Sequence, residues 1–347
     1  DAATPVVAAP SEPAEPERNA SLELAFVGDV IFGRYRGPNF DPIPEDGHEV
    51  FAEIQPDLEA DVLVGNLETP VVRELPASSP IGARFRFGAS KAHAQHLVTA
   101  GFDAMSLANN HWYDQRTEGV EQSPLVLNEL GIVPLGAAHM EAPFFRIDTV
   151  EKQGWKLGFI AITTRTNSPI RPGLPVVPYL STNDIPEIIV PLVTQAKSEH
   201  DLVIVMVHWG DEYAEKPSFM QVKAAHALID AGAAMVIGHH PHVLQAVERY
   251  GAGLVAYSMG NFLFENTHDI PRLTGVLHVR VRDEGRCIER AAFHPAYIKR
   301  TPVQHPVPAT GGMGKRVRTR VTDQSKAFDT TWTLEGEDLV LASPACG

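Results

Sequence analysis

The stretch "DLVIVMVHWG", residues 201–210, is apolar at nearly every position and then turns polar at His208. A strand that is apolar on both faces is typical of a parallel sheet covered by helices on each side. A helix-like pattern follows at 218–232, and a second apolar run follows at 233–238. We therefore predict a strand, a helix and a second parallel strand over this part of the chain.

The same alternation extends outward from this unit in both directions. Further strands are predicted at 22–28, 61–66, 102–109, 132–137 and 155–163, and later at 253–261, 275–281 and 287–300. Further helices are predicted at 48–60, 90–101, 118–131 and 184–199. This order predicts an α/β fold with a largely parallel central region. The last three strands have no helix between them and indicate an antiparallel portion.

The two ends of the chain differ from this alternating region. Residues 1–20 are rich in Ala, Pro and Glu without apolar periodicity, which is typical of a disordered tether. Such a tether, in a sequence that begins with Asp and not with Met, favours an exported protein of the cell surface or periplasm. The protein would be lipid-anchored through an N-terminal signal that has been removed, although an artificial start would look the same. We expect one domain over 21–302 and a C-terminal extension over 303–347, where "FDTTWTLEGEDLVLA" offers a final strand pair.

Composition and charge narrow the classes of function. The chain has 347 residues, 44% of them hydrophobic, which is ample for a large core. Its formal net charge of -14 argues against nucleic acid as a partner, because phosphate binding needs a basic face. Cys287 and Cys346 do not form a Cys-x-x-Cys pair, so no thiolate metal site is expected, and nothing indicates a disulfide between them.

Polar side chains follow six predicted strands at their carboxyl ends, the edge where open α/β sheets bind ligands. In chain order they are Asp29 and then Arg34, Asn66 and Glu68, Asn109 with Asn110 and His111, His208, the group His239, His240 and His242, and Asn261. One such residue is typical of a turn or a helix cap. Six strand ends in succession, all carrying residue types that bind metals, instead predict a site.

The side chains of this set indicate which ligand the site takes. They combine imidazole, carboxylate and amide oxygen without thiolate, which suits divalent Mn, Zn or Fe. Two such cations a few ångströms apart could share a bridging water, generate hydroxide and clamp the oxygens of a displacement at phosphorus. We therefore expect divalent metal ions, two in number, at this edge.

Six segments at these strand ends resemble the capsule-synthesis protein CapA family, also called the poly-γ-glutamate synthesis protein family. They are "FVGDVIFGR", "GNLETPV", "SLANNHWYD", "VHWGDEY", "GHHPHVLQ" and "YSMGNFLF", between residues 26 and 264. The family is similar to the calcineurin-like metallophosphoesterases. The resemblance therefore implies a metallophosphoesterase-like two-sheet α/β sandwich of four layers with a dinuclear site.

The resemblance also implies a role for each strand-end residue. The metals would be held by Asp29, Glu68, Asn110, His208, His240 and His242, with Glu68 preferred to Asn66 as the bridging ligand because it carries charge. His111 and Arg34 would stabilise the developing charge as catalytic residues. Asn66, Asn109, His239 and Asn261 would support the ligands or contact substrate. Ile31 stands where such phosphoesterases carry a histidine, so one metal has lost a ligand or takes it from elsewhere.

The function implied by the resemblance is a metal-dependent hydrolase of the phosphoesterase type, associated with poly-γ-glutamate capsule synthesis or cell-envelope polymer metabolism. Its substrate would be a phosphoester or polyglutamate-type molecule, and its partner a membrane-bound capsule synthesis complex. Two alternatives stay open. Ile31 favours a non-catalytic accessory subunit of a polyglutamate synthesis or export complex, whereas attack on a carbonyl would make a γ-glutamyl amide hydrolase or transferase.

Overall fold

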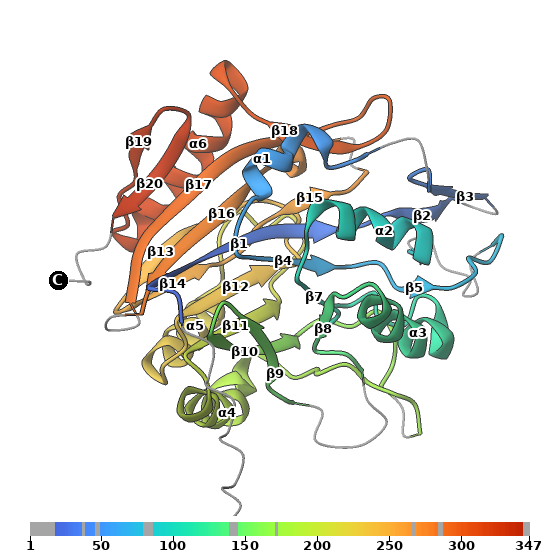
Figure 1. Cartoon of the computed structure of the whole chain (residues 1–347), viewed down its shortest axis with the longest axis horizontal. Coiled ribbons are helices and arrows are strands. Elements are labelled where there is room, and N and C mark those ends of the chain that lie inside the picture. Colours follow the sequence, from blue (N-terminus) through green and yellow to red (C-terminus); the bar gives the residue numbers. More distant parts are fainter. Residues whose placement is uncertain are drawn as a thin grey trace, which may run out of the picture.

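Two mixed β-sheets pack face to face between outer layers of helices (Figure 1). The computed structural model describes residues 18–36, 39–45, 49–78, 86–138, 145–170, 173–265, 268–283 and 287–342. The predicted two-sheet, four-layer α/β sandwich is confirmed. The part of the chain that is described contains no helix both long and apolar enough to cross a membrane.

The larger sheet has its strands in the order β19-β20-β17-β16-β1-β4-β7-β8. Its parallel half consists of β1 (Ser21–Val30), β4 (Val62–Leu67), β7 (Ala104–Ser106) and β8 (Val133–Leu135). Its antiparallel half consists of β16 (Leu273–Arg282), β17 (Cys287–Lys299), β20 (Asp338–Ala342) and β19 (Thr333–Glu335). Two short strands join at the side, β15 (Asn261–Leu263) on β1 and β18 (His305–Pro308) on β17. The predicted antiparallel portion is therefore confirmed.

The smaller sheet has the order β13-β14-β12-β11-β10-β9. Parallel pairing joins β10 (Trp155–Thr163), β11 (Leu202–His208), β12 (Met235–His239) and β14 (Gly253–Ala256). The edge strands β9 (Asp148–Lys152) and β13 (Val247–Tyr250) are antiparallel. Every residue of β11 is buried, as its continuous apolar sequence predicts.

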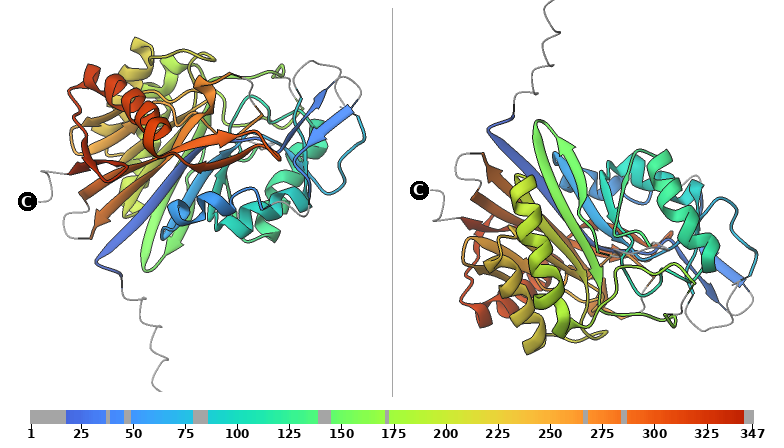
Figure 2. Two further views of the ribbon diagram at one scale, coloured as in Figure 1. Left: turned by 90° about the horizontal axis from the view of Figure 1, so that it is seen from above. Right: turned by 90° about the horizontal axis from the view of Figure 1, so that it is seen from below.

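Helices cover the outer faces of both sheets (Figure 2). Those packed on the larger sheet are η1 (Ala52–Ile54), α1 (Gln55–Leu58), α2 (Lys91–Ala100) and α3 (Arg116–Glu129), while η2 (Thr182–Asp184), α4 (Ile185–Glu199) and α5 (Phe219–Asp230) lie on the smaller one. Between the sheets, Phe26, Phe159 and Leu277 belong to one buried apolar cluster. Two small ladders complete the described strands, β2 (Gly33–Arg36) with β3 (Asn39–Pro42) and β5 (Val71–Val72) with β6 (Ala89–Ser90).

Two helical segments differ from the prediction. The helix predicted over 48–60 is reduced to η1 and the one-turn α1, with Pro56 at the start of α1 and residue 48 outside the described part. Conversely, α6 (Gly311–Ser325) was not predicted, because its first turn is rich in glycine. Val317 and Val321 of α6 are buried in the core between the sheets, and tertiary packing of this apolar face offsets the low helix propensity of glycine. The remaining short helices are η3 (Ile270–Arg272) and η5 (Lys326–Phe328).

The final strand pair predicted from "FDTTWTLEGEDLVLA" is confirmed as β19 and β20. β20 continues the larger sheet beside β17. Cys287, at the start of β17, is disulfide-bonded, which the sequence did not indicate. The chain has one other cysteine, Cys346, which lies outside the described residues.

Candidate metal centre

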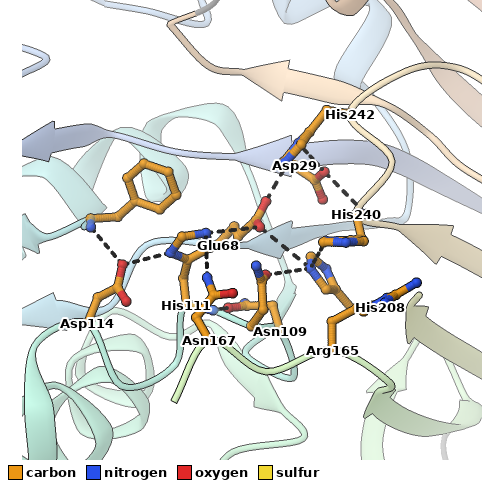
Figure 3. Close-up of polar contacts among 12 residues, drawn as sticks. Asp29, Glu68, Asn109, His111, Asp114, Arg165, Asn167, His208, His240 and His242 are labelled. Carbon is orange, nitrogen blue, oxygen red and sulfur yellow. Dashed lines mark hydrogen bonds and ion pairs between the residues drawn. The ribbon is translucent and has the colours of Figure 1, made fainter. Parts of the chain in front are cut away.

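The carboxyl ends of parallel strands from both sheets meet at one edge of the sandwich. In the larger sheet, Asp29 of β1 lies in register with Asn66 of β4 and with Asn261 of β15. In the smaller sheet, His208 of β11 lies in register with His239 of β12. Figure 3 shows that this convergence brings carboxylates of the first sheet to face imidazoles of the second.

Two glycines allow the strands to approach closely at this edge. A β-carbon on Gly28 would lie 2.1 Å from the carbonyl oxygen of Gly260, and one on Gly238 would lie 2.1 Å from that of Tyr257. Both neighbours are backbone atoms, which cannot swing aside as a flexible side chain does. Gly28 precedes Asp29 and Gly238 precedes His239, so the glycines set the position of the residues that follow them.

The turn after β12 holds two of the imidazoles in strained backbone conformations. His240 has φ 97° and His242 has φ 58°, a region that costs a residue with a side chain about 1–3 kcal/mol. The backbone N–H of Tyr213 donates to the carbonyl of Pro241 at 2.8 Å, and that of His240 donates to Asp29 Oδ2 at 3.4 Å. These contacts fix the turn, and strain of this kind concentrates at functional sites.

One group of ligand atoms surrounds His208 Nε2. This nitrogen lies 2.8 Å from Asn110 Oδ1, 3.1 Å from His240 Nδ1 and 3.5 Å from Glu68 Oε1. All are electron-pair donors when the imidazoles are neutral, and one hydrogen on His208 cannot satisfy three acceptors. Ligands of one cation, each about 2.0–2.2 Å from it, lie roughly 3–4 Å apart. The group therefore fits a single metal ion.

A second group surrounds His242 Nδ1. This nitrogen lies 2.8 Å from Asn261 Oδ1, 3.2 Å from Asp29 Oδ2 and 4.0 Å from Glu68 Oε2. The Asn261 amide donates to the carbonyls of His242 at 3.3 Å and Pro271 at 3.0 Å, which turns its oxygen toward the imidazole. Asp29, Glu68 and His242 can thus hold one ion, as Glu68, His208 and His240 can hold another.

Glu68 is common to the two groups. Its side chain is fully buried, and among the described residues neither carboxylate oxygen has a hydrogen-bond partner. Burial, and after it the negative charge of Asp29, raises the pKa of Glu68 well above its usual range. A buried carboxylate without hydrogen bonds is costly unless a charge compensates it, and a divalent cation would do so. The donor set therefore fits bound divalent metal.

Protonation differs between the two groups in the metal-free chain. Burial, followed by the charge of nearby histidines, lowers the pKa of His208 well below the usual value and that of His240 to about 3. Burial also opposes the charge on His242, but Glu68 and Asp29 outweigh it and raise its pKa to about 9. Burial would raise the pKa of Asp29, yet the hydrogen bond and charge of His242 lower it. The first group is therefore ready to ligate, since neutral imidazole is the form that binds metal.

His111 lies beside Glu68 and forms a dyad with Asp114, a residue that was not predicted. His111 Nδ1 lies 2.7 Å from Asp114 Oδ2, and His111 Nε2 lies 3.8 Å from Glu68 Oε1 (Figure 3). Asp114 is fully buried and also accepts from Arg86 Nη1 at 2.9 Å. The signal was the spacing in "NHWYD", which puts a carboxylate one turn after the histidine.

Asn66, Asn109 and His239 make supporting contacts around these groups. Asn66 Nδ2 donates to Asp29 Oδ1 at 2.8 Å. Asn109 donates to the Leu67 carbonyl at 2.9 Å and accepts from the His111 backbone at 3.1 Å, which fixes the loop that carries His111. His239 Nε2 lies 3.1 Å from the Val27 carbonyl, and burial lowers the pKa of its imidazole. A neutral His239 thus links the two sheets through this hydrogen bond.

Arg34 and Ile31 lie on the wall of the site. Arg34 Nε forms an ion pair with Glu265 at 3.4 Å, so its charge is directed to that carboxylate. Ile31 is buried in a cluster with Phe87 and Phe264. The Phe87 ring lies 4.1 Å from that of His111, centre to centre. Ile31, which stands where the phosphoesterase pattern has a histidine, is thus part of an apolar wall.

The loop that follows β10 also reaches the site and was not predicted. Asn167 Nδ2 lies 3.3 Å from His111 Nε2, and Arg165 on the same loop forms an ion pair with Asp211. Figure 3 shows both residues beside the histidines. The run "TTRTN" at 163–167 directly follows a predicted strand. Its polar residues therefore lie at a strand end, as the predicted site residues do.

Comparison with known proteins finds a matching family, relatives in Bacillus and a similar solved structure. Residues 23–266 match the family described as "Bacterial capsule synthesis protein PGA_cap". The chain is 30% identical over 292 residues to "Capsule biosynthesis protein CapA" of Bacillus anthracis, covering 80% of this chain and 68% of that protein. It is 28% identical over 269 residues to "PGA biosynthesis protein CapA" of Bacillus subtilis (strain 168), covering 76% and 69%. A crystal structure of a phosphatase from Mycoplasma pneumoniae aligns with TM-score 0.49 and 14% identity, covering 80% and 94%.

Proposed function

The chain belongs to the bacterial capsule synthesis protein family PGA_cap, and on that basis we propose that its strand-end cluster is a dinuclear metal centre of a phosphoesterase-type hydrolase. The hydrolase would act in capsule synthesis or cell-envelope polymer metabolism, on a phosphoester or a polyglutamate-type substrate. We further propose that it is exported and acts at the cell surface or in the periplasm with a membrane-bound capsule synthesis complex. The capsule role printed for its relatives and the Ala-, Pro- and Glu-rich first residues support this.

The buried carboxylate of Glu68 carries the proposal. Its Oε1 faces His208 at 3.5 Å, and its Oε2 faces His242 at 4.0 Å. No hydrogen bond from the described residues compensates either oxygen. One cation on each side would compensate both, with His240 completing the first group and Asp29 the second. Mn, Zn and Fe suit this mixture of imidazole and carboxylate.

Bound divalent cations would supply Lewis acidity and lower the pKa of a water that attacks phosphorus. The remaining chemistry belongs to side chains of the protein. His111 Nε2 would donate a proton to the leaving oxygen, a step that general acids accelerate by about 10²–10⁴-fold. Asp114, hydrogen-bonded to Nδ1 at 2.7 Å, would hold the ring in place and stabilise the imidazolium.

A non-catalytic accessory subunit is the second candidate, and Ile31 favours it. The apolar cluster of Ile31, Phe87 and Phe264 stands where phosphoesterases supply a further ligand. In that case the carboxylates and imidazoles at the strand ends would hold metal, or bind polymer, without turnover. A γ-glutamyl amide hydrolase or transferase is the third candidate, because a metal-activated water can also attack a carbonyl carbon.

Metal analysis combined with an ester panel separates these candidates. The full chain would be incubated with Mn²⁺, Zn²⁺ or Fe²⁺, desalted, analysed by mass spectrometry for metal, and assayed on nitrophenyl phosphate, bis-nitrophenyl phosphate and γ-glutamyl nitroanilide. We expect two ions per chain and turnover that His111→Ala lowers by about 10²–10⁴-fold and that His240→Ala abolishes. His226→Ala is the matched control, since its imidazole pairs with Glu248 outside the cluster.

Each outcome of this experiment has a defined meaning. Metal uptake without turnover of any of these substrates would favour the accessory subunit. Turnover of a γ-glutamyl amide alone would favour the third candidate. A chain that takes up no metal would contradict the metal centre itself.

A further inference from the structure

The loop after β10, residues 164–167, spans the metal centre from one ligand group to the general acid. At its start, the backbone N–H of Thr164 donates to the carbonyl of His208 at 2.8 Å. At its end, the backbone N–H of Asn167 donates to the carbonyl of Asn110 at 3.3 Å, and its side chain contacts His111. The loop is therefore fixed at both ends by residues of the site, and Arg165 lies between these points.

The guanidinium of Arg165 is held loosely. It pairs with Asp211, whose side chain is 80% exposed, and exposed ion pairs of this kind contribute only about 0–1 kcal/mol. Its Nε is buried and has no hydrogen-bond partner among the described residues. An anion that offers better geometry could replace Asp211 at little cost.

Arg165 also differs from the other arginines near the site. Arg86 binds the buried carboxylate of Asp114, and Arg34 is directed to Glu265. Figure 3 shows Arg165 beside His208 and His240. Among these three arginines, Arg165 is thus the one that lies beside the first ligand group and has an exchangeable partner.

We propose that Arg165 binds an oxygen of a phosphoryl group held at the metal centre and thereby selects phosphomonoesters as substrates. The inference rests on the proposed metal centre. The phosphoryl group of a monoester has three terminal oxygens, so it can contact two cations and still present an oxygen to a third cationic group, whereas a carboxylate has two oxygens in all. The planar guanidinium with its fork of N–H donors matches phosphate oxygens. Asn167, at the other end of the loop, positions His111 beside the same group.

Binding of inorganic phosphate tests this role without relying on turnover. Calorimetric titration of phosphate into the manganese-loaded full chain would compare wild type with Arg165→Ala and Arg165→Lys. We expect Arg165→Ala to weaken phosphate binding by about 10- to 100-fold, the range typical for loss of a charged hydrogen bond. Arg165→Lys keeps the charge but loses the forked N–H donors of the guanidinium. Its affinity for phosphate should therefore lie between those of wild type and Arg165→Ala. Arg290→Ala is the matched control, because Arg290 is similarly exposed at 38% and pairs with Glu335 on the edge of the larger sheet.

Three further measurements make the result specific. Metal content of each variant should equal that of wild type, since Arg165 is not a ligand. Glutarate, a dicarboxylate, should bind weakly and with little dependence on Arg165. In ester turnover, Arg165→Ala should raise KM more than it lowers kcat, because the contact forms when substrate binds.

Three results would overturn the inference. Unchanged phosphate affinity in metal-loaded Arg165→Ala would remove the role of Arg165 and leave the metal centre intact. Glutarate binding that depends on Arg165 more strongly than phosphate binding does would assign the residue to carboxylate recognition instead. Wild-type protein that binds no metal would remove the metal centre, and the role of Arg165 with it.

Discussion

Glu68 Oε1 lies 3.5 Å from His208 Nε2, too far for a good hydrogen bond and at the separation expected for two ligands of one cation. The other oxygen of Glu68 stands in a similar relation to His242, at 4.0 Å. A single carboxylate therefore joins the ligand sets contributed by β11 and by the turn after β12.

Replacing Glu68 should separate metal binding from stability. Glu68→Gln keeps the volume and removes a buried charge that has no hydrogen bond, so the metal-free variant should melt at the wild-type temperature or above it. Its stabilisation by added Mn²⁺ or Zn²⁺ should disappear, because ligand binding to the folded state is what raises the melting temperature. Thermal melts with and without metal measure both effects.

Glu248 supplies the control for this substitution. It is also a buried glutamate, but it accepts from His226 at 2.9 Å and from the Tyr257 hydroxyl at 2.5 Å. Glu248→Gln should therefore destabilise the fold by about 1–3 kcal/mol while metal-dependent stabilisation persists. If Glu68→Gln behaved in the same way as Glu248→Gln, the proposed role of Glu68 would be wrong.

The His111–Asp114 dyad should affect turnover without affecting metal content. His111→Ala should lower kcat by about 10²–10⁴-fold, since it removes the proposed general acid. Asp114→Asn should lower kcat less, because His111 remains but loses the carboxylate that stabilises its protonated form. Steady-state kinetics with metal analysis of each variant provides the measurement. Loss of bound metal in His111→Ala would show that this residue is a ligand rather than an acid.

Much of this architecture was predictable from the sequence, and the predictions that failed did so for physical reasons. The apolar run that became β11 and its neighbours predicted the parallel sheets, because burial on both faces leaves a continuous apolar pattern. The family resemblance, drawn from six short segments, is confirmed by the match over 23–266. α6 was not predicted because its stability comes from burying Val317 and Val321 in the core. Helix propensity depends on the local sequence and does not include this tertiary packing.

The site was predictable to the extent that its residues follow strands. The strand-end rule found Asp29, Glu68 and His208, which the structure brings together through the register of distant strands. It did not distinguish a residue that faces the cluster from one that faces away, such as His239, because that depends on tertiary packing. Arg165 follows β10 at a strand end, but a guanidinium does not ligate metals, so a pattern of metal-binding residue types does not include it.

Gly28 should tolerate no side chain. In Gly28→Ala the new β-carbon would meet the Gly260 carbonyl oxygen, which the wild-type backbone places 2.1 Å from that point, and we expect a loss of about 3 kcal/mol or more with loss of metal binding. Gly312→Ala, in the first turn of α6, meets no atom within 4 Å and should change stability by less than about 1 kcal/mol. Chemical denaturation of both variants makes the comparison. Equal stability of the two would contradict the close approach of β1 to the segment before β15.

Acid should weaken the contact between β1 and β16. The hydrogen bond from His278, with further help from Arg280, lowers the pKa of Glu23 to about 2 although burial opposes this. A lowered carboxyl pKa contributes stability above the unfolded value, near 4.5, that is lost as pH falls toward 2. Because Glu23 is partly exposed, we expect Glu23→Gln to cost about 1–2 kcal/mol at pH 7, and most of this cost should be lost as the pH falls from about 4.5 to 2.5. Denaturation curves from pH 7 to 2.5 test this, and a cost independent of pH would contradict it.

Anomalous X-ray diffraction from crystals of the manganese- or zinc-loaded chain tests the central claim most directly. The account predicts two metal peaks, one on each side of the Glu68 carboxylate, with His208 and His240 around one and Asp29 and His242 around the other. A single peak away from Glu68, or no peak among these residues, would contradict it.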